Sequence, residues 1–321
     1  MNDKTLTFET ALASADGNVA ALAWRDAWRL QARNHPWMSA GLGLALVAVA
    51  LLLSAGIREG LSGGGEPLRL AMLGGLAGFG ATALGALAGV VLRRLSARAE
   101  DSLLGFAAGM MLAASSFSLI LPGLAAAKEM TGSGALGALT VVGGMALGVL
   151  LMLGLDRFTP HEHDSTGPCG PGCERIGRVW LFVLAITLHN LPEGMAIGVS
   201  FAQGDMGVGL PLTGAIAIQD IPEGLAVVMA LRAAGVKAWP AVLLAGASGL
   251  MEPLGSLFGA GIAGGLALAY PVGLGLAAGA MIFVVSHEVI PETHRNGHQT
   301  SATLGLMAGF AVMMFLDTAL G

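Results

Sequence analysis

The sequence predicts an all-α integral membrane protein, with an eight-span inverted-repeat (3+2+3) core preceded by one extra N-terminal span. Hydrophobic residues make up 55% of the 321 residues, charged residues only 12%, and the mean hydropathy is +0.74. A soluble protein of this size needs about twice that charged fraction to cover its surface. The 50 glycines follow no G-X-Y period, and small residues at this density suit helices that pack closely in lipid.

Nine apolar segments are each long enough to cross a bilayer, which takes about 20 residues. They cover residues 37–57, 68–92, 102–126, 134–155, 179–203, 207–231, 239–260, 262–286 and 300–320. The expected organisation is a cytosolic segment at 1–36, the extra span at 37–57, and the eight-span core at 68–321 with a cytosolic loop at 157–178.

The positions of Lys and Arg predict the orientation in the membrane. With the N-terminus in the cytosol, 13 of the 16 basic residues fall in cytosolic segments, and only Arg58, Arg69 and Lys128 are external. Cytosolic loops carry an excess of Lys and Arg in membrane proteins. The sequence therefore predicts a cytosolic N-terminus, an odd number of spans and an external C-terminus.

Short sequence matches indicate an internal repeat. LGAL at 84–87 resembles LGSL at 254–257, and GFAAGMM at 105–111 resembles GLAAGAM at 275–281, both 170 residues later. MLGLD at 152–156 resembles MMFLD at 313–317, 161 residues later. The two members of each pair cross the membrane in opposite directions. This pattern predicts an inverted repeat of three spans, an arrangement that places a transport site near the midplane.

The two spans between the repeats carry a duplicated motif. HNLPEG begins at His189 and QDIPEG begins at Gln219, 30 residues later. A short connection makes the two helices antiparallel, and at a rise of about 1.5 Å per residue both motifs fall near the bilayer centre. His189 and Glu193 are four residues apart, as are Gln219 and Glu223, so each helix directs a polar cluster toward its partner.

Four acidic residues are expected at mid-depth, where no Lys or Arg is placed: Glu193, Asp220, Glu223 and, in the seventh span, Glu252. A carboxylate at the bilayer centre costs about 2.5–3.5 kcal/mol, so such acids indicate a pathway for protons, metal ions or both. Together with one imidazole and the amides of Asn190 and Gln219, they suit Zn²⁺, Fe²⁺, Mn²⁺ or Cd²⁺ better than Na⁺ or Ca²⁺. Two alternatives remain: Pro192 and Pro222 merely kink the helices, or the acids relay only protons.

The paired motif in such a core resembles the ZIP family of metal transporters, over residues 68–321. The resemblance implies uptake of a divalent metal into the cytosol, with Zn²⁺ as the main substrate and Cd²⁺, Fe²⁺ or Mn²⁺ as further candidates. It also implies a homodimer, and a moving bundle of spans two, five, six and seven. We expect a bacterial member in the lipid bilayer of the cell inner membrane, without enzymatic activity or a nucleic-acid partner.

Carried over by position, the resemblance implies two adjacent metal positions. The first would take His189, Glu193, Gln219 and Glu223, and the second Asn190, Glu193, Asp220, Glu223 and Glu252, so that Glu193 and Glu223 bridge the two. Many family members begin the second motif with His-Glu, where this chain has Gln219-Asp220. One imidazole is therefore missing, which leaves the preferred metal open.

Other residues allow two interpretations. Met111, at mid-depth in the third span, could offer a thioether to a soft metal or fill a gap in the core. Asp101 fits an exit ligand or a helix cap. Asp156 and Asp317, at matching ends of the repeats, fit ligands at the two mouths or solvated helix ends.

Two polar clusters are expected on the cytosolic side. The loop contains two His and two Cys within thirteen residues, 161–173, and could capture released zinc or serve as a linker. The cluster near the inner end of the eighth span comprises His287, Glu288, Glu292, His294 and His298. It could form a release path, or hold ordinary surface side chains.

An intramembrane metallohydrolase is the alternative from another class. Zinc proteases need H-E-x-x-H, which places both His on one helix face. Neither His161-Glu162-His163 nor His287-Glu288 has that spacing. The sequence therefore favours a transporter, and it leaves the coupling ion and the choice between channel and carrier open.

Overall fold

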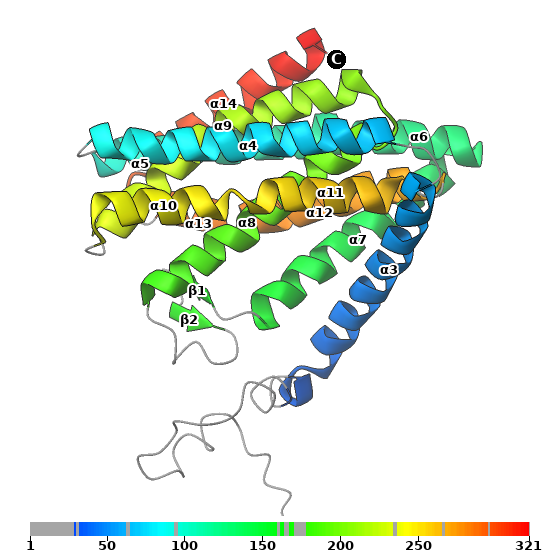
Figure 1. The fold of residues 1–321 in the computed structure, drawn as a ribbon, viewed down its shortest axis with the longest axis horizontal. Helices are drawn as coiled ribbons and strands as arrows, with labels where there is room; N and C mark the ends of the chain where they lie inside the picture. Colours follow the sequence, from blue (N-terminus) through cyan, green and yellow to red (C-terminus); the bar gives the residue numbers. More distant parts are fainter. Residues whose placement is uncertain are drawn as a thin grey trace, which may run out of the picture.

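The fold is taken from a computed structural model that describes residues 29, 32–61, 65–92, 96–158, 161–163, 167–169, 178–233, 236–264, 267–294 and 296–320. Long helices dominate this part of the chain (Figure 1). The elements are α3 (Pro36–Leu61), α4 (Gly65–Val91), α5 (Ala97–Ala114), η1 (Ser115–Ile120), α6 (Leu121–Thr131), α7 (Gly134–Phe158), β1 (His161–His163), β2 (Gly167–Cys169), α8 (Arg178–Phe201), α9 (Met206–Ala233), α10 (Ala238–Ser248), α11 (Met251–Ala263), α12 (Ala269–Val284), η3 (Val285–Val289), α13 (Ile290–Thr293) and α14 (Gln299–Leu320).

The predicted class, an all-α membrane protein, is confirmed. Within the described residues, eight helical stretches are long and apolar enough to cross a membrane: α3, α4, α5–α6, α7, α9, α10–α11, α12–α13 and α14. The 24-residue α8 runs among them as the remaining expected span. Most of the predicted cytosolic segment at 1–36 lies outside the described residues, so its location stays a prediction.

The loop between α7 and α8 contains a structural feature that the apolar pattern did not predict as an element. β1 and β2 form an antiparallel hairpin in which His161 pairs with Cys169 and His163 with Gly167. The hairpin lies beside the start of α8 (Figure 1). The side chains of this loop lie outside the described residues, so zinc capture there stays a prediction.

Three of the spans are not continuous α-helices. The π-helical turns η1 and η3 interrupt the third and eighth spans, and they begin 170 residues apart, at Ser115 and Val285. The seventh span breaks between α10 and α11 at Gly249 and Leu250. Such π turns are frequent at functional sites, and a broken membrane helix exposes backbone ends to bound ions.

The helix contacts have the symmetry that the repeat predicts. α4 packs on α9 as α11 packs on α8, and α5 packs on α14 as α12 packs on α7. The repeat matches α4 with α11 (spans two and seven), α5 with α12 (spans three and eight), α7 with α14 (spans four and nine), and α8 with α9 (spans five and six). Exchanging the two members of every pair converts each of these contacts into its counterpart. The main apolar core lies where α5, α8, α9 and α12 meet.

Glycines at matched positions allow these helices to approach each other closely. A Cβ at Gly105 would overlap the carbonyl oxygen of Ala302, and a Cβ at Gly275 would lie only 2.5 Å from that of Val141. Gly275 follows Gly105 by 170 residues and Ala302 follows Val141 by 161, which are the two offsets found in the sequence. The repeat is therefore present in the packing as well as in the sequence.

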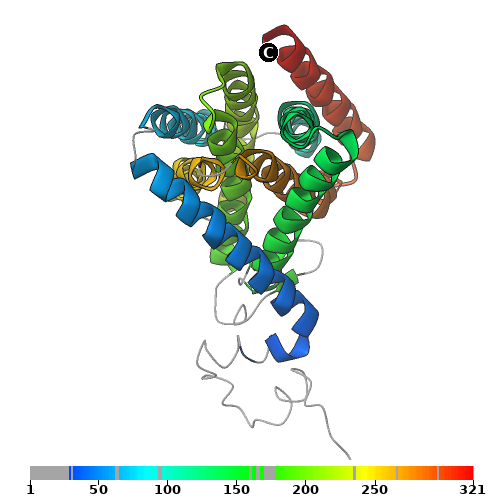
Figure 2. The same ribbon diagram turned by 90° about the vertical axis from the view of Figure 1, so that its right-hand side faces the viewer.

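The extra first span lies outside the repeat. Figure 2 shows α4 and α11 nearly end-on and α3 running obliquely past them. Ala45 and Val49 of α3 share an apolar cluster with Leu151 of α7 and Ile262 of α11. α3 thus contacts one span from each repeat, while many of its described side chains stay exposed.

Candidate metal centre

The duplicated motif lies in the middle of two adjacent helices. His189 is halfway along α8, and Asp220 is close to the middle of α9. Each helix contains the motif proline, Pro192 or Pro222, which lacks an N–H group and leaves the carbonyl four residues earlier without its usual helical donor. The seven motif and acidic side chains predicted as ligands are all buried: His189, Asn190, Glu193, Gln219, Asp220, Glu223 and Glu252.

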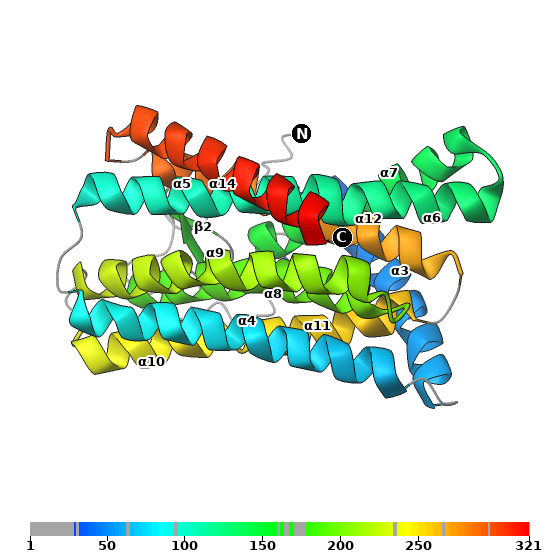
Figure 3. The same cartoon turned by 90° about the horizontal axis from the view of Figure 1, so that it is seen from above.

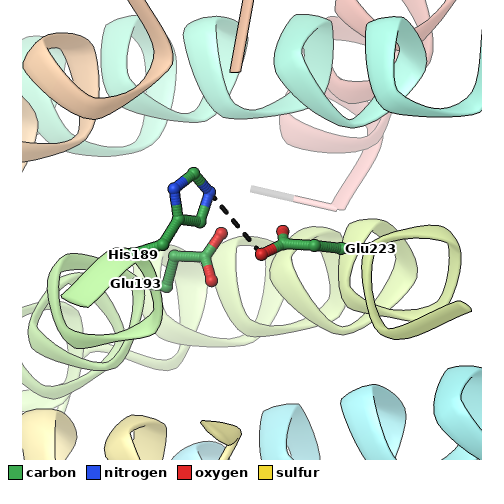
Figure 4. A group of neighbouring side chains, drawn as sticks. All are labelled: His189, Glu193 and Glu223. Carbon is green, nitrogen blue, oxygen red and sulfur yellow. Dashed lines mark ion pairs between the residues drawn. The ribbon is translucent and has the colours of Figure 1, made fainter. Parts of the chain in front are cut away.

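Three of these side chains converge on one point between α8 and α9. Figure 4 shows His189, Glu193 and Glu223 directed toward one another. One ligand atom from each lies within 4.8 Å of the others, and His189 Nε2 is 3.6 Å from Glu223 Oε1. One imidazole nitrogen and two carboxylates at this separation fit the ligand preferences of Zn²⁺. They are three of the four ligands that the sequence predicts for the first metal position.

Gln219, the predicted fourth ligand, is joined to this group. Its Nε2 donates a hydrogen bond of 2.5 Å to Glu193 Oε1. Its own Oε1 and the Oε2 of Glu193 are buried without a hydrogen-bond partner among the described residues. Buried acceptors without a donor are costly, and a cation bound between the helices would satisfy both.

A second pair of carboxylates lies beside the first group. Glu252 Oε2 and Asp220 Oδ2 are both buried and receive no hydrogen bond from a donor group in the described part of the chain. The two carboxyl groups lie within hydrogen-bonding reach of each other. A Cβ at Gly78 of α4 would overlap Glu252 Oε2 and would lie 3.3 Å from Asp220 Oδ2. The missing side chain at Gly78 therefore makes room for the Glu252 carboxylate, whose Oε2 lies close to Asp220 Oδ2.

The break in the seventh span places Glu252 at a helix end. Glu252 lies in the first turn of α11, and its N–H donates to the carbonyl of Gly249 at 3.0 Å. The N-terminus of a helix carries a partial positive charge that stabilises a carboxylate. The apolar run from 239 to 260 was predicted as one continuous span, but it contains Pro253. This proline lacks the N–H that a continuous helix would donate to the carbonyl of Gly249.

Comparison with known proteins identifies the family. A model described as ZIP zinc transporter matches residues 157–317. The chain is 67% identical to the zinc transporter ZIPB of Bordetella bronchiseptica over 92% of this chain and 96% of that protein. It is 42% identical to the zinc transporter GufA of Myxococcus xanthus over 75% of this chain and 95% of GufA. With the human zinc transporter ZIP11 it shares 31% identity over 78% of this chain and 97% of ZIP11.

The chain belongs to the ZIP zinc transporter family. This result confirms the resemblance that was based on the duplicated motif. The assignment of individual ligands in this ZIP protein stays a prediction. Asn190 is buried next to His189 in the chain. Met111 is buried in the apolar core cluster together with Met110 and Met281, a setting typical of a residue that fills a gap.

The cluster predicted on the cytosolic side continues from the metal centre toward the surface of this ZIP protein. His189 Nδ1 is 4.0 Å from Glu288 Oε2, so the imidazole lies between Glu223 and Glu288. The preceding residue, His287, has its Nε2 3.9 Å from Asp156 Oδ1, and its side chain is 47% exposed. These residues make a series of ligand-type side chains from the buried centre to the surface.

Other members of that cluster have different partners. His298 Nδ1 is 2.9 Å from Asp101 Oδ2, and Asn296 Nδ2 donates to Asp101 Oδ1 at 2.8 Å. Ser96 caps α5 by accepting from the Ala99 N–H, so the interpretation of Asp101 as the helix cap is wrong. Asp101 instead connects the start of α5 to the start of α14.

Asp317 is the repeat counterpart of Asp156. It accepts a 2.5 Å hydrogen bond from Ser118 Oγ in η1. Ser118 precedes Glu288 by 170 residues, and Asp317 follows Asp156 by 161. The two repeats therefore carry equivalent acids next to equivalent π turns.

Thr82 is the polar neighbour of the site that sequence reasoning missed. Its hydroxyl oxygen lies 2.7 Å from Glu252 Oε1. The available signal was the repeat offset, because Thr82 and Glu252 are 170 residues apart.

Proposed function

We propose that the protein is a zinc transporter that takes Zn²⁺ up across the bacterial inner membrane into the cytosol. The observation that carries this proposal is the convergence of His189, Glu193 and Glu223 between two central helices. The relatives from Bordetella bronchiseptica and Myxococcus xanthus carry the name zinc transporter, which supports the same substrate here. The transporter names also favour a role other than that of an enzyme.

The arrangement of side chains supports a route through the protein. Asp317, which accepts a hydrogen bond from Ser118, is on the predicted outer side. Glu288, His287 and Asp156 continue from the buried centre toward the predicted inner side. A metal that leaves the centre would exchange one set of carboxylate and imidazole ligands for another of the same kind. Such an exchange means that the divalent ion is never without ligands in an apolar environment. The free energy of transferring a bare ion from water into such an environment is prohibitively high.

The two pairs of free side-chain oxygens support two metal positions instead of one. Glu193 Oε2 and Gln219 Oε1 belong to the first position, and Asp220 Oδ2 and Glu252 Oε2 to the second. A mixed set of one imidazole, carboxylates and amide oxygens also accepts Cd²⁺, Fe²⁺ and Mn²⁺. We propose that the active protein is a homodimer, as the family resemblance implies.

Zinc flux into proteoliposomes tests the proposal. The purified full-length protein is reconstituted around a zinc-sensitive dye, and the initial rate is measured with and without competing Cd²⁺, Fe²⁺ or Mn²⁺. We expect zinc accumulation that is lost in the Glu193→Gln/Glu223→Gln double variant and kept in Glu66→Gln, a control acid that is exposed in the first turn of α4. Accumulation no faster than in protein-free liposomes would contradict the proposal.

A further inference from the structure

The side chain of Thr82 makes a directed contact with an acid of the metal centre. Thr82 Oγ1 lies 2.7 Å from Glu252 Oε1 and 3.3 Å from the carbonyl oxygen of Gly78. A hydroxyl has one proton, and a hydrogen bond to a carboxylate is shorter and stronger than one to a neutral carbonyl. The shorter contact therefore takes the proton, and Thr82 donates to Glu252.

This hydrogen bond fixes which oxygen of Glu252 remains free. With Oε1 held by Thr82, the free oxygen is Oε2, which lies with Asp220 Oδ2 over Gly78. Thr82 and Glu252 are both buried, so water does not substitute for a lost donor without a rearrangement of the helices around them.

The break in the seventh span leaves room for the same hydrogen bond. A Cβ at Gly249 would lie 3.2 Å from Thr82 Cγ2 and 3.3 Å from Glu252 Oε1. These distances are tight for a side chain, so a larger residue at 249 would press on both partners. Glycine at this position therefore lets the methyl group of Thr82 pack while its hydroxyl faces Glu252.

We propose that Thr82 is a positioning residue for the second metal position, where it orients Glu252 so that Oε2 and Asp220 Oδ2 together bind a divalent cation. Gly78 makes room for the Glu252 carboxylate in this orientation, because any side chain at 78 would overlap Oε2. This inference rests on the proposed function. It adds a residue of α4, outside the duplicated motif, that sets the affinity of one metal position and acts through Glu252 without touching the metal.

The internal repeat explains why a threonine is suited to this place. Thr82 and Glu252 occupy equivalent positions of the two repeats, 170 residues apart, and they meet between α4 and α11. Two acids at these positions would repel each other in a buried setting. One acid and one hydroxyl form a hydrogen bond instead, so the repeat has diverged into a ligand and its donor.

Metal titration of the purified full-length protein tests this role. Zn²⁺ is titrated calorimetrically into the parent, Thr82→Val, Thr82→Ser and the control Thr213→Val. Valine keeps the shape of threonine and removes the donor, whereas serine keeps the hydroxyl. Thr213 is another buried threonine, and its Oγ1 has no hydrogen-bond partner among the described residues. Zinc flux into proteoliposomes is measured for the same four proteins.

We expect two zinc ions in the parent, and in Thr82→Val a weakening of about 10- to 100-fold at one position only, the usual effect of removing a group that orients a metal ligand. Thr82→Ser and Thr213→Val should titrate like the parent. If Thr82→Val is not recovered as a folded protein, Thr82→Ala is judged by the same criterion.

Three results would overturn the inference: a single ion in the parent, equal titrations for Thr82→Val and Thr213→Val, or a Thr82→Ser variant as weak as Thr82→Val. The flux assay separates these results from a failure of the proposed function. If the parent accumulates zinc but Thr82→Val binds zinc normally, the proposed transport function stands and only the role of Thr82 is contradicted. If the parent accumulates no zinc, both the proposed transport function and the role of Thr82 are contradicted.

Discussion

Glu193 and Glu223 each have a motif partner three residues earlier and another four residues earlier, so each is placed to serve both metal positions. We therefore expect Glu193→Gln or Glu223→Gln to lower the zinc flux by about a hundredfold or more, because each change damages both positions. Asn190→Ala or Glu252→Ala should leave partial flux, because each disturbs only the second position. Initial rates in proteoliposomes measure the difference.

Metal counting supplies the control for this prediction. The parent should bind two zinc ions, and the Glu252→Ala variant should bind one. One ion in the parent, together with normal transport by Asn190, Asp220 and Glu252 variants, would contradict the binuclear interpretation. The first position would then remain as the only transport site.

Gln219 is the residue at which this chain departs from the common family motif. Its amide oxygen is free while its Nε2 donates to Glu193. Gln219→His replaces an amide with an imidazole, and zinc favours nitrogen ligands more strongly than manganese does. We expect the zinc-to-manganese preference in competition flux assays to rise by about tenfold, because the added ligand is the one zinc prefers. An unchanged preference would show that Gln219 does not bind the transported metal.

The sequence allowed most of the candidate site to be predicted, but not the residues that support it. Acids such as Glu193 and Asp220 stand out in apolar spans because burying an unpaired charge is so costly. Thr82 and Gly78 do not stand out, since threonine and glycine are ordinary residues of membrane helices. Their roles depend on which helix faces α11, and that information is absent from the local sequence.

The close contact between α7 and α12 predicts that alanine substitutions at two neighbouring glycines of α7 differ in their effect on stability. A Cβ at Gly144 would overlap the carbonyl oxygen of Val272 in α12, whereas a Cβ at Gly143 would meet no atom within 4 Å in the described part of the chain. Gly144→Ala should lower the free energy of unfolding by about 1–3 kcal/mol, because the backbone of α12 must move away. Thermal unfolding in detergent measures the change.

The matched control and the repeat counterpart make this prediction specific. Gly143→Ala should be neutral or slightly stabilising, because alanine favours a helix more than glycine does. Gly305→Ala should behave like Gly144→Ala, since a Cβ there would overlap the carbonyl oxygen of Ser102. Equal stability of the Gly143 and Gly144 variants would show that the α7–α12 contact is looser than described.

Elements were predictable where hydrophobicity changes, and unpredictable where it does not. Each apolar run corresponds to a helical span because a buried backbone in lipid must satisfy its own hydrogen bonds. The break at Gly249 and the π turns at 115–120 and 285–289 lie inside predominantly apolar runs. Each interruption comes shortly before a proline, Pro122, Pro253 or Pro291, which lacks the N–H that would continue the helical hydrogen bonds. Proline alone does not predict an interruption, however, because Pro192 and Pro222 lie inside continuous helices.

At the scale of the whole molecule, the helix order places the chain connections at two opposite ends. Figure 3 shows the end of α4 and the starts of α5, α10 and α14 at one end of the bundle, and the junctions of α6 with α7 and of α11 with α12 at the other. The hydrogen bond from Arg98 Nε to Ser301 Oγ joins the starts of α5 and α14 at the first end. The predicted alternation of inside and outside segments agrees with this arrangement.

The orientation of those two ends is the last prediction, and it rests on the distribution of 13 and three basic residues. In a variant whose Cys169 and Cys173 are replaced by Ser, single cysteines are introduced at Gly134 and Lys237, at the α6–α7 and α9–α10 connections. Three spans separate these positions, so they lie on opposite sides of the membrane. A membrane-impermeant maleimide added to intact cells should label Gly134→Cys, and Lys237→Cys only after the membrane is permeabilised. The reverse pattern would invert the topology and would place Glu288, His287 and Asp156 at the outer end of the route.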